Sequence, residues 1–140
     1  MNYLKILPFL LLLGACATSP VKVSEAKMVP EKRFYKFQKP DEKRTAKIIV
    51  VRDSGFSGSA LDYNIHVDNE KVCTLTSGEK AEFYVEPKEH IISAAYEMFG
   101  EGGRTSAETT IAANETKIFR LSIGYGYSKL ERMSPIDSGE

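Results

Sequence analysis

The chain has 140 residues, and its 19 Lys and Arg residues balance its 19 Asp and Glu residues, so the formal net charge is zero. This balance argues against nucleic acid as a partner, because proteins that bind nucleic acid usually carry a basic surface. The length suits one domain with a hydrophobic core of its own.

The first predicted element is a short apolar run near the start of the chain. Lys5 gives the opening residues a positive charge, and residues 6–13 are apolar and interrupted only by Pro8. The run is far shorter than the roughly 20 residues of a membrane-spanning helix. A charged start, a short apolar run and small residues behind it are typical of a secretory signal.

The residues that end this run are Leu13-Gly14-Ala15-Cys16. They resemble the lipobox of bacterial lipoproteins. The resemblance implies a signal peptide over residues 1–15, cleavage between Ala15 and Cys16, and lipid on the thiol and the new amino group of Cys16. Ala17 and Thr18 follow instead of an aspartate, which by resemblance to enterobacterial sorting favours the outer membrane. The alternative is an ordinary signal peptide cut near Ala15 or Ala17.

Residues 16–45 have the composition of a linker. They include three prolines spaced ten residues apart, eight Lys and Arg residues against four Asp and Glu residues, and little apolar periodicity. Such segments are usually extended and poorly ordered, so we expect a flexible tether that spans roughly 30 Å. The aromatic residues Phe34, Tyr35 and Phe37 are the exception, and we expect them to pack against the domain.

From Ala46 onward the sequence consists of short runs of β-forming residues between turn residues. This pattern, without any helical periodicity, predicts an all-β fold with seven or eight strands, a small immunoglobulin-like or prealbumin-like β-sandwich. We expect residues 46–133 to form this domain and to fold without the tether, and residues 134–140 to form a disordered tail. The expected strands cover residues 48–51, 61–67, 71–75, 79–85, 90–98, 104–112, 116–123 and 129–133.

Alternation along the strands predicts which side chains face the core. Residues 61–67 alternate between apolar and polar types, so the even-numbered residues Asn64 and His66 are expected on a solvent-exposed face. The same periodicity places Phe83 and Phe119 in the core. The turn after residue 67 and the following strand complete a predicted hairpin.

Few residues suggest chemistry. His66 and Asp62 would lie about 13 Å apart on one strand, too far to share a metal ion, and His90 suits the start of a strand. Cys73 has no partner in the chain if Cys16 carries lipid, and a buried small side chain fits it better than a reactive thiol. We therefore predict no catalytic residue, metal or cofactor. The alternative is a small periplasmic hydrolase or metal-binding protein.

Three tyrosines are candidate surface-binding residues. Tyr84 belongs to the polar face of a predicted strand, and Tyr125 and Tyr127 flank a glycine in a predicted turn. Exposed tyrosines often contact glycans or proteins, because an apolar ring carries a polar hydroxyl. The alternative is that they cover strand edges and pack on the aromatic residues of the tether.

The order of strand and turn residues resembles a domain-of-unknown-function family of Gram-negative lipoproteins, with features shared by PEGA domains. The resemblance covers about residues 37–123 and implies a small β-sandwich on a lipid anchor, with no catalytic residue to carry over. Lys88 stands where the family usually has glycine. The residues that carry the resemblance are Phe37, Pro40, 46–52, Gly55, Gly58, 65–68, 71–72, Leu75, Gly78, Phe83 and 85–90.

These observations together predict a lipid-anchored lipoprotein of the cell envelope, attached through its N-terminal lipid and facing the periplasm. We expect a non-catalytic binding or structural module whose partner is an envelope protein or peptidoglycan. Its function should reside in loops at the ends of the sandwich or on the polar face of residues 61–67.

Overall fold

The computed structural model describes residues 19–56, 58–98 and 101–134. The predicted signal peptide, the cleavage after Ala15 and the lipidation of Cys16 lie outside these residues, as does the predicted tail beyond residue 134. No helix in the described ranges is long and apolar enough to cross a membrane.

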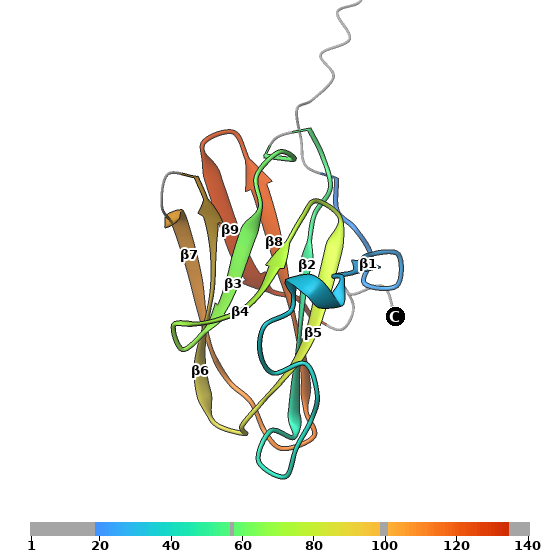
Figure 1. The fold of residues 1–140 in the computed structure, drawn as a ribbon, viewed down its shortest axis with the longest axis vertical. Coiled ribbons are helices and arrows are strands. Elements are labelled where there is room, and N and C mark those ends of the chain that lie inside the picture. Colours follow the sequence, from blue (N-terminus) through green and yellow to red (C-terminus); the bar gives the residue numbers. More distant parts are fainter. Residues whose placement is uncertain (1–18, 57, 99–100, 135–140) are drawn as a thin grey trace, which may run out of the picture.

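Two β-sheets pack face to face, which confirms the predicted β-sandwich (Figure 1). The first sheet has the strand order β1-β5-β2-β8-β9, and the second has the order β4-β3-β6-β7. In chain order the strands are β1 (Lys27–Met28), β2 (Ala46–Arg52), β3 (Tyr63–Val67), β4 (Glu70–Leu75), β5 (Glu79–Val85), β6 (Glu89–Glu97), β7 (Glu101–Thr110), β8 (Thr116–Gly124) and β9 (Tyr127–Arg132).

The core lies between the two sheets and contains the side chains that alternation predicted. Phe83 and Phe119 are completely buried there. Strand β2 lies in the middle of its sheet, antiparallel to β5 and parallel to β8. Its four consecutive β-branched residues are buried on both faces: Ile48 and Val50 enter the main core, while Ile49 and Val51 form a second cluster on the outer face.

The predicted hairpin of β3 and β4 is present. Its connection places Asp68 at φ 49° and Asn69 at φ 68°, two consecutive left-handed residues of the kind found in type I′ turns. Asn and Asp tolerate this conformation better than most residues. The turn therefore sets the antiparallel pairing of β3 with β4.

The prediction of a flexible tether over residues 16–45 is wrong for its described part. Residues 19–45, here called the arm, lie along the sandwich as an ordered segment (Figure 1). Strand β1 pairs in parallel with β5, a short 3-10 helix follows at Glu31–Arg33, and Phe34 forms a β-bridge with Cys73 of β4. The arm thus pairs with β5 of the first sheet and with the edge strand β4 of the second sheet.

Backbone hydrogen bonds explain why the arm is ordered despite its composition. The amide of Val29 donates to Lys80 in β5 at 2.8 Å, and the amide of Tyr35 donates to Val72 in β4 at 2.8 Å. Unpaired strand edges need such partners or other protection. Val23 enters the second cluster and is buried, so the arm also contributes apolar surface to the fold.

The expectation that the aromatic residues of the arm pack on the domain is confirmed for Phe34 and Phe37, which contact the main core. Tyr35 is half exposed, but its hydroxyl lies 3.1 Å from Oγ1 of Thr74.

The polar face predicted for β3 is not exposed to solvent. Asn64 is 1% exposed and His66 is 5% exposed. Oδ1 of Asn64 accepts a hydrogen bond from Thr74 at 2.8 Å, and its amide donates to Glu97 at 3.1 Å. The alternation of β3 is real, but Asn64 on its polar side is hydrogen-bonded by side chains of β4 and β6, and Tyr35 of the arm contacts Thr74 beside it.

Candidate binding site at one end of the sandwich

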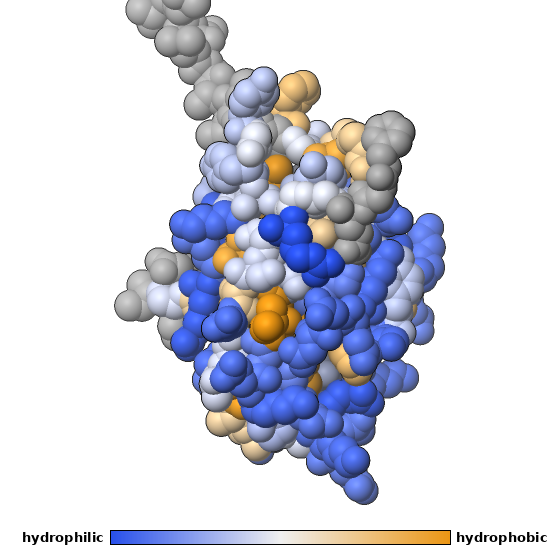
Figure 2. Space-filling view, turned by 90° about the vertical axis from the view of Figure 1, so that its left-hand side faces the viewer, coloured by the Kyte–Doolittle hydropathy of each residue, from blue (hydrophilic) through white to orange (hydrophobic). Residues whose placement is uncertain are grey.

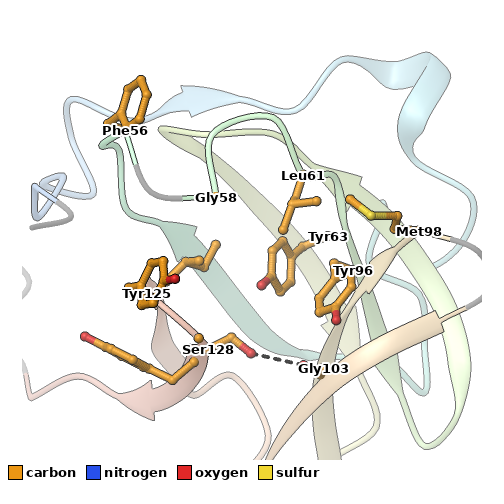
Figure 3. A pocket seen from close by; sticks show the side chains of 13 residues that line it. Phe56, Gly58, Leu61, Tyr63, Tyr96, Met98, Gly103, Tyr125 and Ser128 are labelled. Atoms are coloured by element: carbon orange, nitrogen blue, oxygen red, sulfur yellow. Dashed lines mark hydrogen bonds between the residues drawn. The ribbon is translucent and has the colours of Figure 1, made fainter. Parts of the chain in front are cut away.

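Three connections meet at one end of the sandwich and enclose an apolar pocket of about 670 Å³ (Figure 3). They are the loop from β2 to β3, the described residues beside the β6–β7 connection, and the turn between β8 and β9. This end is called the pocket end below. The lining residues are Phe56, Gly58, Leu61, Tyr63, Tyr96, Met98, Gly103, Ile123, Gly124, Tyr125, Gly126, Tyr127 and Ser128.

The inner wall of the pocket is built on two tyrosines from neighbouring strands. The rings of Tyr63 in β3 and Tyr96 in β6 lie edge to face with centroids 5.9 Å apart. Tyr63 is 2% exposed, and burial raises the pKa of its phenol above the usual value near 10, although a hydrogen bond with Ser128 opposes this. Its hydroxyl therefore stays protonated at neutral pH.

A buried arginine supports this wall from behind. The guanidinium carbon of Arg52 lies 4.9 Å from the centre of the Tyr63 ring, a cation–π arrangement. Its two terminal nitrogens donate to the carbonyl oxygens of Leu75 at 2.8 Å and Gly58 at 2.7 Å. Burial lowers the pKa of Arg52, yet an arginine remains charged at neutral pH. Arg52 thus fixes the β2–β3 loop, which forms one side of the pocket.

The outer edge of the pocket, here called the rim, consists of Phe56, Met98, Tyr125 and Tyr127. These residues are 88%, 49%, 96% and 59% exposed. They make up four of the seven large hydrophobic side chains that are exposed among the described residues. Such a concentration of exposed apolar surface usually marks an interaction site.

Figure 2 shows one side of this arrangement. The upper end of that face is a mixture of pale blue, white and orange, whereas strong hydrophilic blue covers most of the body below it, apart from an orange patch in its middle.

Two glycines let tyrosine rings approach the backbone closely. A Cβ atom at Gly124 would lie 2.0 Å from the ring of Tyr127, and one at Gly103 would lie 2.1 Å from the ring of Tyr96. Gly103 also has φ 56°, a conformation that other residues rarely adopt. The hydroxyl of Ser128 donates to the carbonyl of Gly103 at 3.0 Å and ties the two connections together (Figure 3).

The structure brings together two of the three predicted surface tyrosines. Tyr125 and Tyr127 both belong to the rim. Tyr84 lies elsewhere, beside a smaller hollow of about 200 Å³ that Phe34 also lines, and the ammonium group of Lys47 lies 5.7 Å from the centre of its ring.

The titratable residues singled out from the sequence lie outside the pocket lining. His90 is buried, with Nδ1 2.7 Å from Asp68 and Nε2 2.7 Å from the carbonyl oxygen of Glu86. Cys73 is buried in the main core, and burial raises the pKa of its thiol. Within the described ranges, no three His, Cys, Asp or Glu residues come close enough to hold a metal ion.

Comparisons with known proteins give no family for this chain. No family model matches it, and no curated protein matches its sequence. A protein from Eubacterium rectale, solved by NMR, is similar in structure at 12% sequence identity and a TM-score of 0.44, with 71% of this chain and 99% of that chain covered. The predicted resemblance to a family of Gram-negative lipoproteins therefore stays a prediction.

Proposed function

We propose that this protein is a lipid-anchored, non-catalytic binding module of the bacterial cell envelope, and that the pocket is its binding site for an apolar ligand. In this proposal the lipid is on Cys16, the anchor is in the outer membrane and the sandwich faces the periplasm. The single observation that carries the binding role is the pocket with its exposed apolar rim.

The size and chemistry of the pocket support an apolar ligand. Ligand pockets usually have volumes of about 300–1,000 Å³ and a mostly apolar lining with a few polar groups. Here the lining residues carry aromatic, aliphatic and thioether side chains, and the tyrosine and serine hydroxyls are the polar groups of those side chains. The site therefore suits a ligand that is largely apolar and has few polar atoms.

The same lining supports binding without catalysis. No Asp, Glu, His, Cys, Lys or Arg is among the described residues that line the pocket. General acid–base catalysis needs a group whose pKa lies near the working pH. The phenol of Tyr63 has a raised pKa, so it is a hydrogen-bond donor and not a base.

The anchor is tested by replacing Cys16 with serine. We expect wild-type protein to incorporate an alkyne-tagged fatty acid and to sediment with the outer membrane in a density gradient. Cys16→Ser should lose the label and remain largely uncleaved at this site. Undiminished labelling of the mutant would contradict the proposed anchor.

The pocket is tested with an environment-sensitive naphthalene dye and the chain from residue 16 onward, carrying Cys16→Ser so that it stays in solution. The double variant Phe56→Ser and Tyr125→Ser should bind the dye more weakly, because it removes the two most exposed parts of the rim. Ile91→Ser is the matched control, since Ile91 is 45% exposed but does not line the pocket. Equal losses in both variants would contradict the proposed site.

A further inference from the structure

The place where the arm begins bears on what the pocket end faces. Ser19 and Ser54 form a β-bridge, with their amide and carbonyl groups 2.5 Å and 3.1 Å apart. Ser54 comes two residues before Phe56 in the same loop. The arm therefore starts at the pocket end and not at the opposite end of the sandwich (Figure 1).

The distance from the proposed anchor to this end is short. Three peptide units join Cys16 to Ser19, and even a fully extended chain spans at most about 11 Å over them. The sequence predicted a tether of roughly 30 Å, which would have left the orientation of the domain free. Because the arm is ordered from Ser19 onward, an anchor at Cys16 holds the pocket end close to the lipid.

We propose that the pocket end is a membrane-docking surface, and that its occupant is a lipid acyl chain of the leaflet that holds the anchor. The rim inserts between the lipid head groups, and the pocket receives the acyl chain. This inference rests on the proposed anchor at Cys16 and specifies the apolar ligand of the proposed binding site.

The chemistry of the rim fits this occupant. Tyrosines concentrate at the boundary between head groups and acyl chains, because an apolar ring carries a polar tip. Tyr125 and Tyr127 would lie at that depth, while Phe56 and Met98 have no polar group and would lie deeper.

The opposite end of the sandwich has a different character. There, Lys36 lies 2.7 Å from Glu70, which begins β4, and Lys88 lies 3.5 Å from Glu86 in the β5–β6 connection. These ion pairs are about half exposed. The opposite end therefore carries exposed ion pairs, whereas no charged side chain is among the described residues that line the pocket on the side of the proposed anchor.

The test uses the absence of tryptophan from the sequence, since a single introduced tryptophan is then the only one in the protein. The lipidated chain carrying Phe56→Trp is transferred to vesicles of phosphatidylethanolamine and phosphatidylglycerol with brominated acyl chains. Ile91→Trp is the control, because Ile91 is exposed near the opposite end of β6. We expect the tryptophan emission of the Phe56→Trp protein to shift to shorter wavelength and to be strongly quenched by bromine, with neither change for the control.

Unquenched emission from Phe56→Trp in protein that is bound to the vesicles would overturn the docking proposal while leaving the anchor intact. Equal quenching at both positions would also overturn it, because the orientation would then not be fixed. Failure of the anchor is recognised separately, since protein without lipid does not sediment with the vesicles after a salt wash. Dye binding by the soluble chain tests the pocket independently of both.

Discussion

Two regions of the molecule depart from the usual rule that apolar side chains are buried and polar ones exposed. They are the side of the sandwich under the arm and the pocket end. Under the arm, polar side chains are buried, and several make hydrogen bonds that cross from one segment to another. Arg33 binds Glu79 through two hydrogen bonds of 2.8 Å and 2.5 Å, and Thr74 links Tyr35 to Asn64. At the pocket end, large apolar side chains are exposed, as the 88% and 96% values for Phe56 and Tyr125 show.

This difference distinguishes contacts that stabilise the fold from apolar side chains that the fold leaves exposed. A buried polar group that has partners contributes to a unique fold, whereas one without partners costs free energy. An exposed aromatic side chain gains nothing in the isolated molecule and becomes favourable only when another surface covers it. Under the arm, Glu79 and Asn64 therefore find hydrogen-bond partners within the chain, whereas the exposed rings of the rim would gain a partner from the ligand that we propose.

The largest expected effect comes from removing the arm. A chain that begins at Ala46 loses the buried side chains of Val23 and Val29, worth about 3–6 kcal/mol together, as well as the pairing along β5 and β4. This is a large share of the 5–15 kcal/mol typical of a domain. Urea unfolding followed by circular dichroism should show a much lower midpoint than for a chain that begins at Ser19. Equal midpoints would mean that the arm does not contribute to the stability of the sandwich.

The strands could be predicted because their signals are local. In β5, for example, the apolar residues Ala81, Phe83 and Val85 alternate with polar ones between a glycine and a proline. The arm could not be predicted in this way, since its apolar residues are sparse and its partners lie far along the chain. Arg33 and Glu79 are 46 residues apart, and nothing near Arg33 shows that a carboxylate will meet it.

For a similar reason, only two of the four rim residues could be predicted from the sequence. Tyr125 and Tyr127 stand out because they flank a glycine in a turn. Phe56 and Met98 belong to other connections, and only the order of the strands brings all three connections to one end. Tyr96 could be assigned to the inner face of a strand, but not to the wall of a pocket.

Alanine substitutions at Phe83 and Phe56 compare the contributions of a buried and an exposed phenylalanine to the free energy of unfolding. Phe83→Ala should lower the free energy of unfolding by about 3–5 kcal/mol, because it leaves a cavity in the core. Phe56→Ala should change it by less than about 0.5 kcal/mol, because the ring is exposed. Urea melts of both variants give the two values. A large cost for Phe56→Ala would assign the rim a structural role and weaken the case for a ligand.

A smaller effect tests the polar contacts under the arm. Arg33→Ala leaves the carboxylate of Glu79, whose side chain is 11% exposed, without its bidentate partner. We expect a loss of about 1–3 kcal/mol. Lys36→Ala is the control, since its pair with Glu70 is half exposed and should contribute less than about 1 kcal/mol. If the control costs as much as Arg33→Ala, the buried pair has no special part in holding the arm.

The smallest expected effect is a dependence on acid that originates under the arm. Burial opposes the charged form of Glu79, but hydrogen bonds from Arg33 and from the amide of Thr76 outweigh it and lower the pKa of this carboxyl below its usual value near 4.5. A depressed pKa in the folded state contributes stability that is present above the unfolded value and is lost as the pH falls through the folded value. Wild-type protein should therefore lose stability from about pH 4.5 downward, and Glu79→Gln should lose less over the same range.

Urea midpoints measured at intervals between neutral pH and pH 3 compare the two proteins, with Glu70→Gln as the control for an exposed carboxylate. Parallel curves for wild type and Glu79→Gln would show that the acid sensitivity arises elsewhere in the fold. A flatter curve for Glu79→Gln, without any change in dye binding at the pocket, would locate this acid sensitivity under the arm and leave the pocket end unaffected.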